Sequence, residues 1–235
     1  MWSAKILQNL GLKIFFIKNL IQIMKVISLV DFKNEEWWNV VSHFLGFIMS
    51  IIGIPFLFYF DSSGTFLSTL SIILFSFGLL FVYSSSSIYH YVTSSKPKKR
   101  FQILDHISIY YLILGSYAPV CLITLYDNSG RTIFIVILIL SIIGTLKKFF
   151  FTAKYEFISL LLYLTMGWLI IFDIKSLFGL IDLNAKLLLI LGGVSYTFGI
   201  IFYAFDKIKY FHSIWHLFVL MGSVLHYFMV LLYII

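Results

Sequence analysis

The sequence predicts an all-α membrane protein, a bundle of seven transmembrane helices with its N-terminus in the cytoplasm and its C-terminus outside. Three observations predict this fold. Hydrophobic side chains make up 61% of the chain and charged ones only 11%, whereas soluble chains carry about 25% charged residues. Apolar runs recur at the length of about 20 residues that crosses a bilayer as a helix. The cations between the runs gather on one side. We therefore expect a multi-pass protein of the plasma (inner) membrane.

Each predicted span is a long apolar run bounded by polar or charged residues. The runs cover residues 40–60, 66–92, 102–125, 132–149, 157–173, 185–205 and 211–234. Gly53, Pro55 and Pro119 fall inside spans, which membrane helices tolerate because neighbouring helices satisfy the freed backbone groups. A membrane β-barrel would show alternating segments of about ten residues, and these runs do not alternate.

The distribution of charge predicts the orientation. The formal net charge is +7, and the chain has 17 Lys and Arg residues. All except Arg131, Lys175 and Lys186 lie before the first span or after spans two, four and six. In this assignment Lys147, Lys148 and Lys154 belong to the loop between spans four and five. The positive-inside rule then places the N-terminus in the cytoplasm. The positive charge needs no nucleic acid to explain it.

The segment 1–36 is expected to be a separate N-terminal unit before a seven-helix membrane domain over 37–235. Its lysines recur at helical spacing among apolar residues. An eighth span would bury Lys13 and Lys18, which is costly in a bilayer. An amphipathic helix on the membrane surface fits this pattern better. A translation start at Met24 is an alternative that the sequence leaves open.

The polar residues inside the spans predict a metal site. Ionisable side chains in a bilayer cost roughly 2.5–3.5 kcal/mol each on insertion scales. His90, Asp105, His212 and His216 lie within about 5–16 Å of the cytoplasmic boundary at 1.5 Å per helical residue. The last two are four residues apart and share a helix face. Three histidines with a fourth position open are typical of catalytic zinc sites. Asp105 would then hold or deprotonate a water, and Ser86 would orient a ligand or donate to an oxyanion.

Simpler interpretations stay open for these residues. A single histidine on an apolar helix is more often a hydrogen-bonded packing residue than a ligand. Imidazole ligands also suit iron, copper or nickel. We favour zinc (Zn²⁺) because span, depth and facing direction converge for His90, His212 and His216.

The other three histidines are expected to have supporting roles. His106 follows Asp105 and points about 100° away from it, in a second layer or at headgroup level. His226 lies deeper and either lines a cavity below the site or pairs with a polar group such as Ser223. The residues expected to fix the first helix near the site are Glu36, Asn39 and His43.

At these positions the chain resembles the hemolysin III family, the bacterial branch of the progestin and adiponectin receptor group. The motifs are Glu36-x2-Asn39-x3-His43, Ser86-x3-His90, Leu104-Asp105-His106, Gly115-Ser116-Tyr117-Ala118-Pro119 and His212-x3-His216 followed by His226. The resemblance implies seven helices and a cytoplasmic N-terminus. It implies that His90, His212 and His216 bind zinc while Asp105 holds a zinc water. Alkaline ceramidases carry a similar site, which implies hydrolysis of a lipid amide.

The sequence therefore leaves three alternative functions open. The first is a membrane-embedded zinc hydrolase of lipid amides or esters. The second is a cytolytic or pore-forming protein, as the family's name suggests, although the spans lack the repeated polar stripe of a channel lining. The third is a structural zinc protein in membrane lipid homeostasis.

Membrane lipids are the expected partners. Cys121 is the only cysteine, so it has no disulfide partner in the chain, and the oligomeric state is not predicted.

Overall fold

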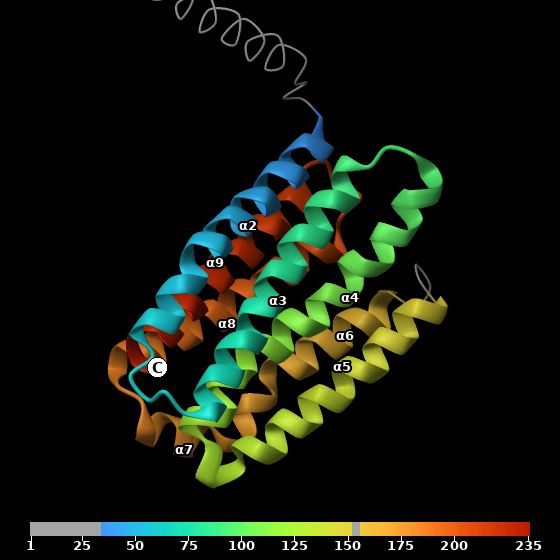
Figure 1. The fold of residues 1–235 in the computed structure, drawn as a ribbon. Helices are drawn as coiled ribbons and strands as arrows, with labels where there is room; N and C mark the ends of the chain where they lie inside the picture. Colours follow the sequence, from blue (N-terminus) through green and yellow to red (C-terminus); the bar gives the residue numbers. More distant parts are fainter. Residues whose placement is uncertain (1–33, 152–155) are drawn as a thin grey trace, which may run out of the picture.

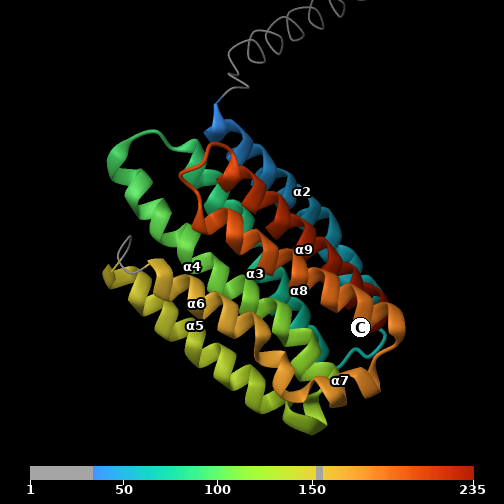
Figure 2. The ribbon, with the colours of Figure 1, turned by 180° about the vertical axis from the view of Figure 1, so that it is seen from behind.

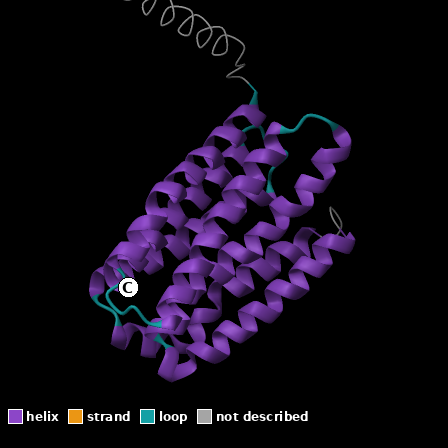
Figure 3. Cartoon of the chain, viewed as in Figure 1, coloured by secondary structure: helices purple, strands orange, loops and turns teal. Residues whose placement is uncertain are grey.

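The described residues of the chain form a bundle of long helices packed side by side (Figure 1). The computed structural model describes residues 34–151 and 156–235. The surface helix expected within 1–36 and the start at Met24 therefore lie almost wholly outside the described residues. All regular structure in the described part is helical, and the loops lie at the two ends of the bundle (Figure 3).

The seven predicted spans are confirmed as seven helical segments that are long and apolar enough to cross a membrane. The elements are α2 (Glu35–Phe60), α3 (Phe66–Tyr91), α4 (Ser95–Pro119) with η1 (Val120–Thr124), η2 (Tyr126–Gly130) with α5 (Arg131–Phe151), α6 (Glu156–Trp168) with η3 (Leu169–Asp173) and α7 (Ile174–Leu180), α8 (Leu183–Ala204) and α9 (Phe211–Tyr233). The chain is thus an integral, multi-pass membrane protein. As an odd number of spans requires, α2 begins at one end of the bundle and α9 finishes at the other (Figure 1).

Helix neighbours close a ring around the bundle interior. Along this ring α2 packs on α3, α3 on α4, α4 on α5 and α6, α6 on α8, α8 on α9, and α9 back on α2. The view from behind shows α8 between α9 and the α4–α6 side (Figure 2). The contact of α6 with α8 is the slightest in the ring. Residues that face the interior of this ring therefore come from spans far apart in the sequence.

Two glycines allow α3 and α4 to approach closely. A Cβ on Gly78 would lie 2.6 Å from the carbonyl oxygen of Tyr111, and one on Gly115 would lie 2.7 Å from that of Leu74. Small residues at such crossings let membrane helices pack backbone to backbone, since apolar burial gives no net attraction between helices in lipid. This close contact holds His90 on α3 and Asp105 on α4 at the same end of the bundle.

Two helices begin earlier than the hydropathy predicted, and both extensions matter for the site. Asn34 caps α2 by accepting a hydrogen bond from the Glu36 amide at 3.0 Å, and this cap starts the helix at Glu35 rather than at residue 40. Helix α4 begins at Ser95 rather than at residue 102. Its first turns carry the basic run Lys96–Arg100, expected as loop. We call this end of the bundle, with Lys96–Arg100 and the 205–210 turn, the lysine-rich end.

Candidate metal centre

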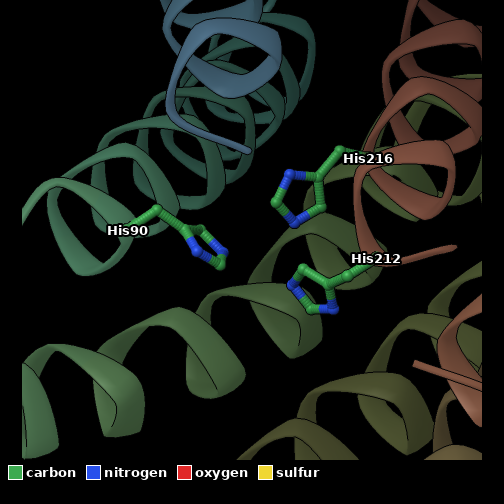
Figure 4. Close-up of side chains that lie close together, drawn as sticks. All are labelled: His90, His212 and His216. Atoms are coloured by element: carbon green, nitrogen blue, oxygen red, sulfur yellow. The ribbon is translucent and has the colours of Figure 1, made fainter. Parts of the chain in front are cut away.

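Three histidines from two helices converge at the lysine-rich end. His90 lies in the last turn of α3, and His212 and His216 lie in the first turns of α9 (Figure 4). Their ligand nitrogens all lie within 4.8 Å of one another. The ring centroids are 4.6–5.1 Å apart. The predicted grouping of these three residues is therefore confirmed.

Hydrogen bonds on the outer side of two rings leave the inner nitrogens free. Nδ1 of His90 lies 2.5 Å from Oε2 of Glu36, so the carboxylate accepts the Nδ1 hydrogen. The Ser42 hydroxyl donates to the Asn39 carbonyl at 3.1 Å, and its oxygen therefore accepts from Nδ1 of His216 at 3.2 Å. In both rings the proton is on Nδ1 and the Nε2 lone pair is available.

The inner nitrogens fit a zinc ion. Nε2 of His90 and Nε2 of His212 are buried and have no hydrogen-bond partner within the described residues. Leaving a buried polar atom unsatisfied costs about 1–3 kcal/mol, so such atoms indicate a missing partner. Metal-bound histidines typically hold their outer nitrogen on a carboxylate or other acceptor. Three neutral imidazoles are a donor set that zinc accepts.

Asp105 and Ser86 meet beside the histidines. Both side chains are buried, at 7% and 1% exposed, and the Ser86 side chain lies near the Asp105 carboxylate. Ser86 is one turn before His90 on α3, and α4 supplies Asp105. Both residues line the same cavity as His212 and His216. The structure therefore brings together all five residues that the sequence predicted for the site.

Two further hydrogen bonds join α2 to the site. Lys98 donates to Glu36 at 2.8 Å, and Ser213 donates to Asn39 at 2.5 Å. The expectation that Glu36 and Asn39 fix the first helix near the site agrees with these contacts. Sequence reasoning missed that Glu36 binds His90 directly. Its i, i+3, i+7 spacing with Asn39 and His43 places all three on one helix face and was the available signal.

His43 lies closer to the cluster than expected of a fixing residue. Its ring centroid is 3.8 Å from that of His216, and the rings are nearly perpendicular. It is 3% exposed, and neither ring nitrogen has a partner within the described residues. It also lines the cavity, but it is not among the three histidines whose ligand nitrogens gather.

A largely apolar cavity of about 280 Å³ extends from the histidines into the bundle. Trp168 and Ile190 line it from α6 and α8 and are also 41% and 46% exposed on the outer surface of the bundle. His226 and Met229 line its deeper part. His226 takes both roles expected of it: it lines the cavity, and its Nε2 pairs with the Leu189 carbonyl oxygen at 3.4 Å rather than with Ser223, which is hydrogen-bonded to Tyr196 at 2.8 Å.

A further buried polar cluster surrounds His106. Lys148 was expected in a loop, and this expectation is wrong: its side chain is 0% exposed and donates to Glu156 at 2.6 Å. Its ammonium also lies 3.2 Å from Nδ1 of His106. Helix α5 is regular to Phe151, so Lys148 lies within the helix, and its side chain points into the bundle, where the Glu156 carboxylate pairs with it. His106 itself lines the cavity, 3.5 Å from the Tyr203 hydroxyl.

The chain is similar to several known proteins over most of its length. Residues 32–227 match the family model described as "Haemolysin-III related". The chain is 37% identical over 201 residues to "Hemolysin-3 homolog" of Bacillus subtilis (strain 168), which covers 85% of this chain and 94% of that protein. It is 37% identical over 212 residues to "Hemolysin-3" of Bacillus cereus, covering 90% and 97%. It is 30% identical over 164 residues to "Monocyte to macrophage differentiation factor" of Homo sapiens, covering 66% of each.

Proposed function

This chain belongs to the haemolysin-III related family of membrane proteins, and we propose that it is a zinc-dependent hydrolase of lipid amides. One observation carries the proposal. Three imidazoles gather beside a buried carboxylate at the end of an apolar cavity, and the inner nitrogens of two of them, His90 and His212, lack partners within the described residues. The lysine-rich end would face the cytoplasm by the positive-inside rule, so the reaction would take place near the inner leaflet of the plasma membrane.

His90, His212 and His216 would hold the ion through Nε2. When bound, zinc acts as a Lewis acid and lowers the pKa of water at its open position to about 7, which makes a nucleophile available at neutral pH. Glu36 and Ser42 keep the outer nitrogens of His90 and His216 protonated, so that Nε2 presents its lone pair.

Asp105 would move the proton of the reaction. Its carboxylate accepts a proton from the attacking water as the water oxygen bonds to the amide carbon. It then returns the proton to the amide nitrogen as the carbon–nitrogen bond breaks, so that a fatty acid and an amine leave. The Ser86 hydroxyl, which lies near this carboxylate, would donate to it and orient it.

The cavity supports a lipid as the substrate. About 280 Å³ of largely apolar space next to the histidines suits part of a hydrocarbon chain. Its walls reach residues that are exposed on the outer surface of the bundle, such as Trp168 and Ile190. A lipid could thus enter from the bilayer without crossing water.

The experiment is fatty-acid release from N-palmitoylsphingosine in phosphatidylcholine vesicles by purified protein. Asp105→Asn should lose at least a hundredfold in turnover, in line with removal of a general base, while its zinc content stays unchanged. Asp206→Asn removes an exposed acid near the same end of the bundle and should behave as wild type. Full turnover by Asp105→Asn would contradict the role of Asp105, and a wild type without turnover would contradict the hydrolase proposal.

The names of the two Bacillus relatives support membrane lysis as a second candidate function. Dye release from the same vesicles separates it from the first. If the His212→Ala/His216→Ala double variant still releases dye, lysis does not depend on the metal site. A structural role of zinc would show as a lower melting temperature on metal removal, with unchanged lipid turnover.

A further inference from the structure

A partly buried ion pair lies next to His106, outside the three-histidine group. Lys148 on α5 and Glu156 on α6 are 2.6 Å apart, and the Lys148 ammonium is 3.2 Å from Nδ1 of His106 on α4. The Tyr163 hydroxyl donates to the His106 carbonyl at 2.8 Å and holds that turn of α4 in place. His106 on α4 thus lies against α5 and α6; of the two charged groups near its Nδ1, Lys148 is within hydrogen-bond range at 3.2 Å and the nearer Glu156 oxygen is 4.0 Å away.

The ion pair determines which nitrogen of His106 carries the hydrogen. Lys148 is charged because a carboxylate oxygen lies 2.6 Å away. A lysine ammonium has three donors and no acceptor, so its contact with His106 is a donation into the Nδ1 lone pair. The neutral ring then carries its hydrogen on Nε2.

The Nε2 hydrogen of His106 has a long contact with a hydrogen-bond acceptor. Within residues 34–151 and 156–235 its nearest partner is the Tyr203 hydroxyl, 3.5 Å away, beyond the usual range for hydrogen bonds of this type. His106, Tyr203 and Asp105 all line the cavity. An N–H donor with a long, weak bond at a cavity wall is ready to donate to a ligand.

We propose that His106 is a ligand-binding residue: its Nε2–H donates to a hydroxyl or carbonyl oxygen of a lipid in the cavity, and the Lys148–Glu156 pair fixes the donating tautomer. The inference rests on the proposed function only for the identity of the lipid as a substrate. His106 points about 100° away from Asp105 around α4. It therefore holds a polar group beside the reacting bond rather than taking part in the proton transfer.

The tautomer is tested by nitrogen NMR of the detergent-purified protein labelled with ¹⁵N-histidine, with His106→Gln assigning the signal. The wild type should show the Nε2–H form. The Lys148→Met/Glu156→Gln double variant removes both partners, so that no charge is left buried alone, and the ring should redistribute between its tautomers. Lys147→Met is the matched control, since the neighbouring Lys147 donates to Ser159 instead, and it should keep the Nε2–H form. An Nδ1–H form in the wild type would overturn the proposal.

Ligand binding is tested with two probes, one with hydroxyl and carbonyl oxygens and one that is a pure hydrocarbon. N-palmitoylsphingosine should shift the His106 Nε2–H signal, whereas hexadecane should not. His106→Leu should weaken binding of N-palmitoylsphingosine about tenfold, the loss expected for one hydrogen bond of about 1.4 kcal/mol. His106→Gln keeps an N–H and should stay within about threefold of wild type. Equal binding by His106→Leu and wild type would contradict the assignment.

The NMR measurement and the binding measurement are both independent of catalysis. If the wild type hydrolyses N-palmitoylsphingosine, His106→Leu should raise KM about tenfold and change kcat much less, whereas a purely structural role would lower the amount of folded protein without that split. If the wild type shows no hydrolysis, the proposed function fails, and the NMR and binding outcomes still decide the role of His106.

Discussion

The Glu36 carboxylate lies 2.5 Å from Nδ1 of His90 and so leaves Nε2 of that ring for a metal ion. The two residues are 54 positions apart and come from α2 and α3. Lys98 of α4 binds the other oxygen of the same carboxylate. One acidic residue therefore ties three helices to a candidate metal ligand.

Loss of this carboxylate should weaken metal binding. We expect Glu36→Gln to lower zinc affinity about 10- to 100-fold. The substitution removes the negative charge that makes Nε2 of His90 more basic and so a stronger metal ligand. Competition with a chromogenic zinc chelator measures the affinity. Glu35→Gln, one residue away in the same helical turn, is the control and should leave the affinity unchanged. Equal affinities of both variants would show that the Glu36–His90 contact does not support a metal ligand.

The hydroxyl behind His216 should have a smaller effect. Ser42→Ala removes the acceptor of the Nδ1 hydrogen, which is one neutral hydrogen bond of about 0.5–1.5 kcal/mol. Zinc affinity should fall about two- to tenfold in the same competition assay. Ser50→Ala removes a hydroxyl that bonds within α2, to the Gly46 carbonyl, and serves as the control. A loss as large as that of a ligand variant would contradict this supporting role.

The α3–α4 contact should not tolerate a side chain at Gly78. In Gly78→Ala the new Cβ would lie 2.6 Å from a backbone oxygen, and overpacking of this kind typically costs about 1–3 kcal/mol. Thermal unfolding in detergent should show a lower melting temperature. Gly179→Ala in α7 meets nothing within 4 Å and should be neutral or stabilising, by up to about 1 kcal/mol of helix propensity. Similar melting temperatures for both variants would argue against the close approach of the two helices.

Removing one member of the Lys148–Glu156 pair should cost more than removing both. Lys148→Met leaves Glu156 without its cation, and breaking a buried pair typically costs about 3–5 kcal/mol. The effect should fall near or below the lower end, because the Glu156 side chain is 36% exposed. The Lys148→Met/Glu156→Gln variant should recover most of the lost melting temperature. A double variant with a lower melting temperature than Lys148→Met would contradict the prediction.

Much of the fold could be predicted from the sequence because the bilayer imposes strong rules. Runs near 20 apolar residues and one-sided lysines predicted the seven spans. Helical periodicity predicted that His212 and His216 share a face, and counting depth predicted that His90 meets them. That these residues hold zinc remains a prediction.

The contacts that the sequence did not reveal depend on side chains near helix ends. Glu36 was assigned to a surface segment, because hydropathy does not detect a helix that begins with acidic residues behind the Asn34 cap. Lys148 was assigned to a loop, because a pair of lysines at the end of an apolar run looks the same whether both face water or one of them pairs with a glutamate of another helix. The positions of Glu36 and Lys148 both depend on which partner a helix distant in the sequence supplies. Hydropathy and spacing along one chain do not identify that partner.

The central claim is tested most directly by the metal content of the detergent-purified protein. We predict about one zinc ion per chain in the wild type, and the same in His226→Ala, since His226 lies in the deeper part of the cavity. His90→Ala should lose the ion, because His90 is one of the three converging ligands. A wild type without zinc, or a His90→Ala variant that retains it in full, would contradict the account.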